Sequence, residues 1–248
     1  MMRACFIIPI YNHHETIAAT VAALMPYQLP IFIVDDGSDS ATKQVLAELV
    51  ARTPFLQLHT LAENTGKGGA VMAGLAQAHA AGMTHGLQID ADGQHDTRDI
   101  PEFWQQAERY PEALISGAPQ YDASMPMSRK IGRKITHFWV HIETLSLRVK
   151  DTMCGFRVYP LETTLATIAE HRPGTRMDFD IEIMVRMYWR GTPIRFIPTQ
   201  VIYPEGGRSH FQAFADNWLI SKMHTRLFFG MLRRAPLLIW RRLRGSSV

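Results

Sequence analysis

The sequence predicts an α/β protein with a mostly parallel sheet flanked by helices, followed by an amphipathic, basic helical segment. Short apolar runs alternate with helical patterns from the first residues onward, and strands separated by helices of about 10–15 residues imply βαβ units. Polar or glycine-rich clusters follow each of the first four apolar runs. Positive charge gathers in residues 213–248.

The first half of the chain alternates regularly. Apolar runs predict buried strands at 5–10, 30–34, 55–61 and 86–89, and the spacing of apolar residues predicts helices at 15–24, 41–51 and 69–81. The second half is less regular. It predicts helices at 99–109, 128–147 and 177–190 and strands at 113–117 and 194–203. Asp99 is a suitable N-cap before Pro101, and Gly191 ends the last of these helices.

The bulk composition is that of a globular protein. The 248 residues are 46% hydrophobic and 20% charged, which is enough apolar mass for a core. Residues 1–212 contain no internal repeat, low-complexity segment or linker, so we expect one domain there and a separate helical segment at 213–248. Cys5 and Cys154 form no CxxC pair, which favours a reducing compartment over a disulfide scaffold or a zinc site.

The start of the chain lacks the long apolar region of a signal peptide, and no apolar run approaches the roughly 18–20 residues that span a bilayer. We therefore expect a cytoplasmic protein, at most peripheral to the inner face of the cytoplasmic membrane. The oligomeric state is not predicted.

The charge of the C-terminal segment indicates its partner. Residues 1–212 carry 19 Lys/Arg against 22 Asp/Glu, whereas residues 213–248 carry 7 against 1. No nucleic-acid motif accompanies this charge, so we expect an anionic membrane surface and no nucleic acid.

Within the segment, polar and apolar residues recur at helical spacing, which is typical of an interfacial helix. A helix packed on the domain and a dimer contact are the alternatives, and Pro236 favours two helical pieces over one. The polar positions are Gln212, Asp216, Asn217, Ser221, Lys222, Thr225 and Arg226, and the apolar ones are Phe211, Phe214, Trp218, Leu219, Met223 and Leu227.

The ends of the first four strands meet at one edge of a parallel sheet, where ligands bind in such folds. Pro9-Ile10-Tyr11-Asn12 follows the first strand and Asp35-Asp36-Gly37-Ser38-Asp39 the second. Asn64-Thr65-Gly66-Lys67-Gly68-Gly69 follows the third, and Asp90-Ala91-Asp92 the fourth. Four aligned polar clusters predict a site.

The loop after the third strand resembles a nucleotide-binding loop without matching one. A Walker A loop needs Ser or Thr after the lysine, where Gly68 stands, and a dinucleotide fingerprint needs a small residue where Val71 stands. Its backbone N–H groups and Lys67 could still meet phosphates at a helix N-terminus. The alternative is a tight turn with a solvated lysine; beside the other clusters, we favour phosphate contact.

The pair Asp90 and Asp92 permits three interpretations. The two carboxylates could be a glycosidase acid/base pair, solvated turn residues, or ligands of a divalent cation that bridges a diphosphate. The neighbouring glycine and Gln94, another oxygen donor, favour the cation, which would be Mg²⁺ or Mn²⁺.

Six motifs, IIPIYNHHETI, IVDDGSDS, NTGKGGAVMAGL, IDADGQHD, DTMCGFRVYP and GGRSHF, follow one another in the order found in family 2 glycosyltransferases with a GT-A, Rossmann-like fold. The chain most resembles the dolichol-phosphate mannose synthase and polyprenyl-phosphate glycosyltransferase branch, over roughly residues 4–212. The resemblance implies that Asp92 and Gln94 bind the metal and that Asp90 contacts the nucleotide. It also implies that Pro9, Tyr11, Glu15 and Asp36 frame the base and ribose.

The chemistry of the acceptor divides the remaining candidates. A lipid phosphate is already anionic and needs cations to position it, for which guanidinium groups are suited. The candidates are Arg129, Arg133, Arg157 and Arg208, of which we expect Arg129 and Arg133 to act with Asp92 at the reaction centre and Arg157 and Arg208 to hold the acceptor phosphate. A hydroxyl acceptor would instead need a base, and Asp178, Asp180 and Glu182 are the candidates, with Asp180 in our catalytic set.

Two departures from the branch concern the acceptor half of the site. Gly117-Ala118-Pro119 stands where the branch usually has Gly-Ser-Arg, and His13 stands where a glutamate is common. The resemblance implies inverting, metal-dependent transfer of a sugar from a UDP- or GDP-sugar to a lipid-linked acceptor, expected to be a polyprenyl phosphate. A hydroxylated lipid or saccharide acceptor, or a catalytically weak nucleotide-sugar-binding partner of a membrane assembly, are the alternatives.

Overall fold

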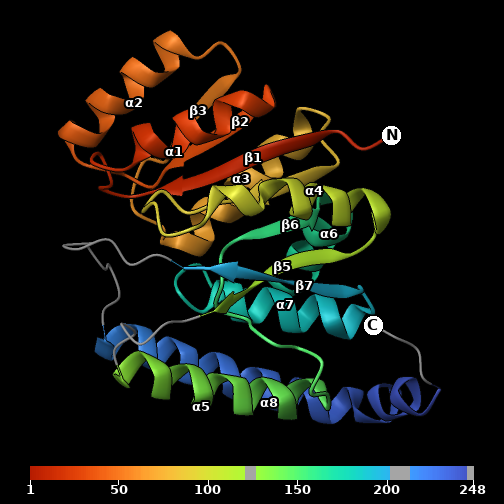
Figure 1. The fold of residues 1–248 in the computed structure, drawn as a ribbon. Helices are drawn as coiled ribbons and strands as arrows, with labels where there is room; N and C mark the ends of the chain where they lie inside the picture. Colours follow the sequence, from red (N-terminus) through yellow and green to blue (C-terminus); the bar gives the residue numbers. More distant parts are fainter. Residues whose placement is uncertain (121–126, 202–212, 245–248) are drawn as a thin grey trace.

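A seven-stranded sheet with the strand order β3-β2-β1-β4-β6-β5-β7 forms the centre of the molecule (Figure 1). The computed structural model describes residues 1–120, 127–201 and 213–244. The strands are β1 (Ala4–Ile10), β2 (Ile31–Asp35), β3 (Leu56–Thr60), β4 (His85–Gln88), β5 (Leu114–Gln120), β6 (Arg157–Pro160) and β7 (Ile194–Gln200).

The sheet is mostly parallel, as predicted. β1 pairs in parallel with β2 and β4, β2 with β3, and β5 with β7, whereas β6 runs antiparallel to both β4 and β5. Ile7 lies opposite Phe32 on one side and Gln88 on the other, so the carboxyl ends of β1, β2 and β4 meet at the same edge.

Helices cover both faces of the sheet. One apolar cluster joins one face to α1, α2 and α4, and a second joins the other face to α3 and to the helices of the second half of the chain. In Figure 1, α5 and α8 lie beyond α7, farthest from the sheet. The helices are α1 (Ile17–Leu24), α2 (Ser40–Arg52), α3 (Lys67–Ala80), α4 (Ile100–Arg109), α5 (Met127–Thr144), α6 (Leu161–His171), α7 (Phe179–Arg190) and α8 (Ala213–Leu243), with short 3-10 turns η1 (Met25–Tyr27) and η2 (Thr97–Asp99).

Most elements lie where the sequence predicts them, but β6 and α6 were missed. β6 carries Arg157 in the middle of the DTMCGFRVYP motif, and a four-residue strand with a buried arginine shows no apolar run. Asp99 precedes α4 as expected, although its Oδ2 accepts from Thr199 Oγ1 at 2.5 Å and it makes no capping hydrogen bond.

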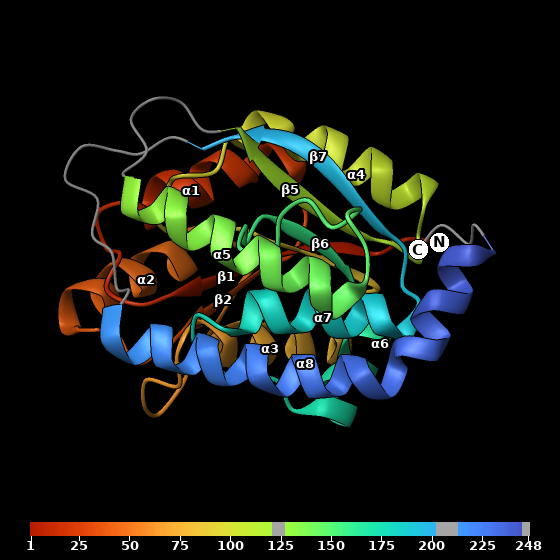
Figure 2. The same cartoon turned by 90° about the horizontal axis from the view of Figure 1, so that it is seen from below.

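The C-terminal segment forms one helix, α8, with Pro236 inside it, so the prediction of two pieces was wrong. Met231 and Leu238, on either side of the proline, are both buried in the core, and this packing holds the helix together across a residue that lacks an N–H donor. The ribbon bends toward its C-terminal end (Figure 2). Asp216, expected on the polar face, is fully buried beside Arg176, at 3.4 Å.

No helix among the described residues combines the length and hydropathy needed to cross a bilayer.

Candidate functional site

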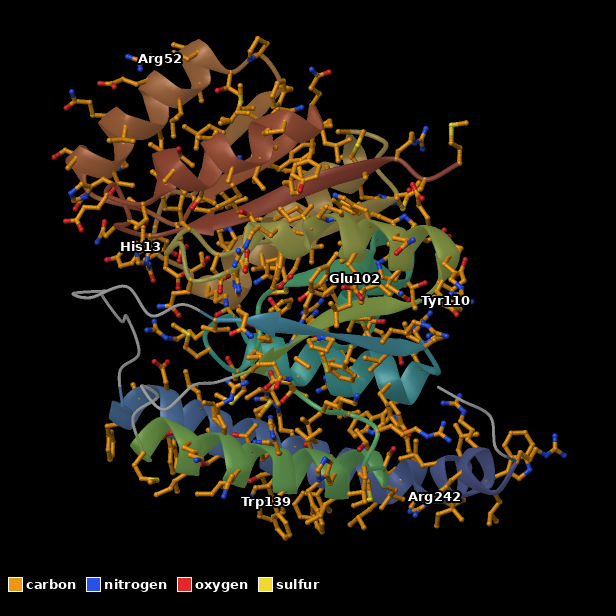
Figure 3. The ribbon with its side chains drawn as sticks, in the orientation of Figure 1. His13, Arg52, Glu102, Tyr110, Trp139 and Arg242 are labelled. Atoms are coloured by element: carbon orange, nitrogen blue, oxygen red, sulfur yellow. The ribbon has the colours of Figure 1, made fainter. Side chains whose placement is uncertain are left out.

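The loops that follow the strands are tied together at the carboxyl edge of the sheet, near the labelled His13 in Figure 3. The Asn12 N–H donates to Ser38 Oγ at 3.0 Å, and the Asp39 N–H donates to Asn12 Oδ1 at 2.8 Å. Asn12 takes a left-handed conformation with φ of 56°, which asparagine tolerates better than most residues. The first two polar clusters therefore form one surface, as the sequence predicts.

The residues expected to frame the base and ribose lie around this surface with different exposure. Pro9 is buried within β1, and Tyr11 is half-buried just beyond the strand. Glu15 is exposed on the loop before α1, with His14 at 3.8 Å. Their contact with a nucleotide stays a prediction.

Asp36 holds the glycine-rich loop in place. Its Oδ1 accepts from the N–H and hydroxyl of Thr65 at 2.7 and 2.9 Å, and its Oδ2 accepts from the Gly66 N–H at 2.9 Å. Burial raises the pKa of this carboxyl, in opposition to the three hydrogen bonds. The carboxylate faces the protein in this structure and fixes the shape of the loop, and its contact with the base stays a prediction.

The glycines of this loop permit a close approach to the start of α7. Gly66 has φ of +95°, and a Cβ there would lie 2.6 Å from the Thr175 carbonyl oxygen. A Cβ on Gly68 would lie 2.4 Å from Phe179 Cβ, which is well inside van der Waals contact. The sequence interpretation of these glycines as a phosphate cradle missed this packing role.

We expect Gly68→Ala to lower the free energy of unfolding by about 1–3 kcal/mol, because the added methyl group forces α3 and α7 apart. Gly132→Ala is the matched control, since Gly132 lies on the exposed side of α5 and a Cβ added there would meet nothing within 4 Å. This control is expected to gain about 0.5–1 kcal/mol. Urea denaturation of both variants measures the difference, and equal stabilities would show that the close approach is unimportant.

Lys67 joins two carboxylates at the centre of the site. Its Nζ lies 2.8 Å from Asp90 Oδ2, at the end of β4, and 3.0 Å from Asp180 Oδ2, in the first turn of α7. Burial alone would lower the pKa of Lys67, but the attraction of Asp180 and Asp90 outweighs it and raises the pKa. The same pairing with Lys67 lowers the pKa of Asp90 in spite of its burial. The ammonium and the Asp90 carboxylate are therefore both ionised at neutral pH.

Asp90 has partners at both carboxylate oxygens. His95 Nε2 lies 3.4 Å from Oδ2, and Gln88 Nε2 donates to Oδ1 at 3.3 Å. The His95 ring stacks on Phe156, with centroids 5.0 Å apart and an interplanar angle of 19°. Asp90 is thus held by protein partners, although its side chain stays 20% exposed. Its direct contact with a nucleotide stays a prediction, and Lys67 contacts carboxylates where phosphate contact was predicted.

Arg157 contacts Asp180 from the interior of the protein and is fully buried. Its Nη1 donates to the Asp180 carbonyl oxygen at 2.7 Å and its Nη2 to the Thr152 carbonyl oxygen at 2.8 Å, while Nη1 lies 3.8 Å from Asp180 Oδ1. A guanidinium with no exposed surface cannot meet the phosphate of an incoming lipid, so the expectation for Arg157 does not fit the structure. Arg157 therefore holds Asp180 in position through the Asp180 carbonyl oxygen.

The other arginine candidates have different positions. The guanidinium of Arg133 is paired with Asp151, whose Oδ1 also accepts the N–H groups of Met153 and Cys154 at 2.8 Å each. The neighbouring His137 and Arg133 lower the pKa of Asp151 to about 2 against the effect of burial. Arg208 and the side chain of Arg129 lie outside the described residues.

Asp92 differs from Asp90 in its hydrogen bonds rather than in its exposure. It is half-buried, its Oδ1 accepts the Gln94 N–H at 3.0 Å, and no hydrogen bond from the described residues reaches its Oδ2. Over the same residues, no three His, Cys, Asp or Glu side chains cluster closely enough to hold a metal ion alone. The open carboxylate oxygen of Asp92 is a donor of the type that Mg²⁺ and Mn²⁺ prefer, so Asp92 would suit a divalent cation.

The three carboxylates considered as general bases are all engaged by the protein. Asp180 is bound to Lys67, and Asp178 is buried, with Oδ1 accepting from the Arg176 N–H at 3.2 Å. Glu182 is fully buried and pairs with Arg186 and Arg226 while accepting the Gly174 N–H. None of the three is an exposed carboxylate without a partner: Asp180 and Glu182 pair with cations, and Asp178 is buried.

A match to a family model identifies the protein family of this chain. Residues 5–164, which contain the first four strands and all of the network except Asp180, match the model of glycosyl transferase family 2. The chain belongs to glycosyl transferase family 2. This membership confirms the resemblance inferred from the six motifs.

Named relatives include proteins that act on polyprenyl phosphates. The chain is 27% identical to the dolichyl-phosphate beta-glucosyltransferase of Dictyostelium discoideum, over 84% of this chain and 65% of that protein. It therefore spans slightly less than two thirds of that protein's length. It is 26% identical to the undecaprenyl-phosphate mannosyltransferase of Micrococcus luteus, over 84% of this chain and 87% of that protein.

Solved structures show the same fold. Glucosyl-3-phosphoglycerate synthase from Mycobacterium tuberculosis, in complex with Mn²⁺, UDP-glucose and phosphoglyceric acid, matches with a TM-score of 0.64 and 14% identity, over 93% of this chain and 78% of that one. S. aureus TarS 1-349 in complex with UDP-GlcNAc matches with a TM-score of 0.62 and 14% identity, over 91% of this chain and 66% of that one. The predicted GT-A fold is confirmed.

Sequence reasoning missed three features of this site. It did not place Lys67 between Asp90 and Asp180, which lie far apart in the chain. It also gave no role to His95, or to Gly155, where a Cβ would lie 2.8 Å from both Lys67 Nζ and Asp90 Oδ2. Each of the three residues stands within one of the six motifs, but the contacts of Lys67 and Gly155 connect different motifs and leave no local signal.

Proposed function

We propose that this glycosyltransferase moves a sugar from a UDP- or GDP-sugar to a polyprenyl phosphate in a divalent-metal-dependent, inverting reaction at the inner face of the cytoplasmic membrane. The observation that carries the choice of acceptor is that Asp180 and Glu182 pair with cations and Asp178 is buried. A phosphate is already anionic and attacks without a general base, whereas an alcohol needs one. Relatives that act on dolichyl and undecaprenyl phosphates support the same choice.

Asp92, with Gln94 beside it, would hold the Mg²⁺ or Mn²⁺ ion, which when bound supplies Lewis-acid stabilisation of the departing diphosphate. Lys67, Asp90 and Asp180 connect the start of α3, the end of β4 and the start of α7, which keeps these three segments in fixed positions. A neighbouring cation offsets the charge of each carboxylate. Asp36 fixes the glycine-rich loop. The acceptor phosphate attacks the anomeric carbon from the face opposite the nucleotide, which inverts its configuration.

The cations that position the acceptor phosphate remain part of the proposal. Gly117-Ala118-Pro119, within β5, supplies no arginine there. Arg129 and Arg208 are the remaining candidates, since Arg157 is buried and Arg133 pairs with Asp151. The C-terminal segment is proposed to keep the chain at the membrane surface, where the lipid acceptor lies.

We expect transfer to polyprenyl phosphate and none to the matching polyprenol. The purified chain would be incubated in detergent micelles with Mn²⁺ and, in turn, UDP-glucose, UDP-GlcNAc and GDP-mannose, and the lipid products separated by chromatography. The alcohol differs from the phosphate only in the nucleophile, so it is the matched acceptor control. Transfer to the alcohol at a comparable rate would contradict the proposal and indicate that one of the three carboxylates acts as a base.

A further inference from the structure

The surface of α5 and α8 that faces away from the sheet is apolar along both helices. In Figure 3 the labelled Trp139 and Arg242 lie on this side, and Figure 2 shows the two helices next to each other. The exposed apolar residues recur at helical spacing. On α5 they include Met127, Ile131, Ile135 and Phe138, and on α8 they include Phe214, Trp218, Phe229, Leu232, Trp240 and Leu243.

Their exposure is large for such side chains. Phe138 is 61% exposed, Trp218 is 63% and Phe214 is 91%. Contiguous exposed apolar surface of this kind marks an interaction site on a soluble protein. We call these ten residues, with the cations beside them, the helix-pair surface.

The helix-pair surface carries positive charge only. The exposed charged residues on the two helices are all cations, among them Lys130, Lys134, Lys222, Arg233 and Arg242. The acidic residues of α5 and α8 are Glu143 and Asp216, and both are fully buried. Apolar stripes beside cations, with no exposed acid, suit a partner that is both apolar and anionic.

The two helices present this surface as one unit. The rings of Trp139 on α5 and Phe228 on α8 meet edge to face, with centroids 6.3 Å apart. His224 Nδ1 lies 2.8 Å from Glu143 Oε1, which joins α8 to α5 within the core. Met223 and Leu227 pack in the same apolar cluster as α7. The surface therefore belongs to the folded body and extends beyond the C-terminal segment.

We infer that the helix-pair surface lies flat on an anionic bilayer, with α5 contributing as a membrane-binding helix beside α8. A second copy of the chain is a poorer occupant, because a two-fold contact would bring identical cationic surfaces together with no exposed acid on either helix to neutralise them. The inference extends the proposed function, which places only the C-terminal segment at the membrane.

The helix-pair surface is linked to the site through the inward side of α5. Arg133 on α5 pairs with Asp151, which holds the N–H groups of Met153 and Cys154, and the next residue is Gly155. The backbone at Gly155 lies against Asp90 and Lys67. The inward side of the N-terminal half of α5 is thus separated from the network by one short loop, which connects the proposed membrane-binding helix with the site.

The test is co-sedimentation of the full chain with sucrose-loaded vesicles of phosphatidylcholine and phosphatidylglycerol, and with vesicles of phosphatidylcholine alone. Lys130→Glu/Lys134→Glu reverses two exposed charges on α5, and Ile135→Ser/Phe138→Ser removes apolar contact there. Lys43→Glu/Arg52→Glu is the matched control, because both residues are exposed on α2, on the opposite side of the molecule (Figure 3). Melting temperatures verify that each variant folds.

We expect each α5 variant to lower the partition constant on anionic vesicles by about tenfold or more, since a basic side chain near such a surface contributes measurably to binding. The control should bind like the unmodified chain, and pure phosphatidylcholine should bind it weakly. Unchanged binding of both α5 variants would overturn the inference. So would a vesicle-free dimer, seen by analytical ultracentrifugation, that these variants dissociate.

This outcome is separable from the proposed function. Melting temperatures with UDP or GDP and Mn²⁺, measured on the same variants without vesicles, report on the donor site alone. Vesicle binding lost with nucleotide binding intact supports the helix-pair surface. Nucleotide binding absent in the unmodified chain, with vesicle binding intact, would contradict the proposed function and leave the helix-pair surface standing.

Discussion

Lys67→Met is expected to lower the free energy of unfolding by about 3 kcal/mol, because it leaves two carboxylates in a largely buried position without their shared cation. Asp90 and Asp180 each lie within 3.0 Å of the Lys67 ammonium. Asp90 retains His95 at 3.4 Å and Asp180 retains Arg157 at 3.8 Å, so the loss should lie near the lower end for a broken buried ion pair. For a chain of this size, the melting temperature should fall by roughly 6–12 °C.

Two further variants isolate the electrostatic origin of this loss. Lys43→Met removes an exposed lysine from α2 and should change stability by less than about 0.5 kcal/mol. Lys67→Met/Asp180→Asn removes one of the unpaired charges as well, and should recover a large part of the stability lost in the single variant. Calorimetry of all three measures the effect. A loss no greater than that of Lys43→Met would show that the network is not holding the site together.

The sequence was sufficient for the parts of the fold that local patterns encode. β1 and β2 are nearly continuous apolar runs because both faces of a central parallel strand are covered, and the helices that follow them show helical spacing. The loops after the first four strands were predicted to share one edge, and the contacts of Asn12 with Ser38 and of Lys67 with Asp90 confirm this.

The parts that were missed depend on contacts between distant residues. Arg157 looks like a surface arginine in sequence, yet it is buried because carbonyl oxygens of Thr152 and Asp180 accept its hydrogen bonds. Gly68 looks like part of a phosphate loop, yet its lack of a side chain is required by Phe179, more than 100 residues later in the chain. Pro236 indicated a break, but core packing on both sides of it maintains one helix.

The acidic turn at residues 90–92 also depends on both local pattern and contacts between distant residues. Asp90 and Asp92 are two residues apart and chemically identical, and in the sequence only the resemblance to a known family assigned them different functions. In the structure Asp90 is enclosed by Lys67, His95 and Gln88, whereas Asp92 has a carboxylate oxygen without a hydrogen bond from the described residues. The two carboxylates are therefore expected to respond differently to substitution.

Asp92→Ala is expected to lower sugar transfer by about a thousandfold or more while leaving the fold intact. We assign the Asp92 carboxylate to the cation because one of its oxygens accepts no hydrogen bond from the described residues. The cation stabilises the charge that develops on the diphosphate by several kcal/mol. The side chain is half-buried and makes one hydrogen bond, to the Gln94 N–H, so stability should change by no more than about 1 kcal/mol. Glu63→Ala is the control, because Glu63 is an exposed carboxylate in the loop after β3.

Nucleotide binding gives a second measurement that does not depend on the acceptor. UDP, GDP, CDP and ADP would each be added with Mn²⁺ and again with EDTA, and the melting temperature recorded. A ligand at about a hundred times its dissociation constant stabilises the fold by about 2.7 kcal/mol, which corresponds to a rise of roughly 5–10 °C. We expect this rise with one nucleotide, only when Mn²⁺ is present, in the unmodified chain and in Glu63→Ala but not in Asp92→Ala.

The two measurements together separate an enzyme from a binding protein. Loss of both transfer and the Mn²⁺-dependent rise in Asp92→Ala would assign the acidic turn to the cation and diphosphate. A metal-dependent rise in an unmodified chain that transfers no sugar to any acceptor would instead support a nucleotide-sugar-binding partner of a membrane assembly. Full transfer by Asp92→Ala would remove the metal from the reaction, because the other carboxylate of the turn, Asp90, is held by Lys67 and His95 and is not placed to substitute for it.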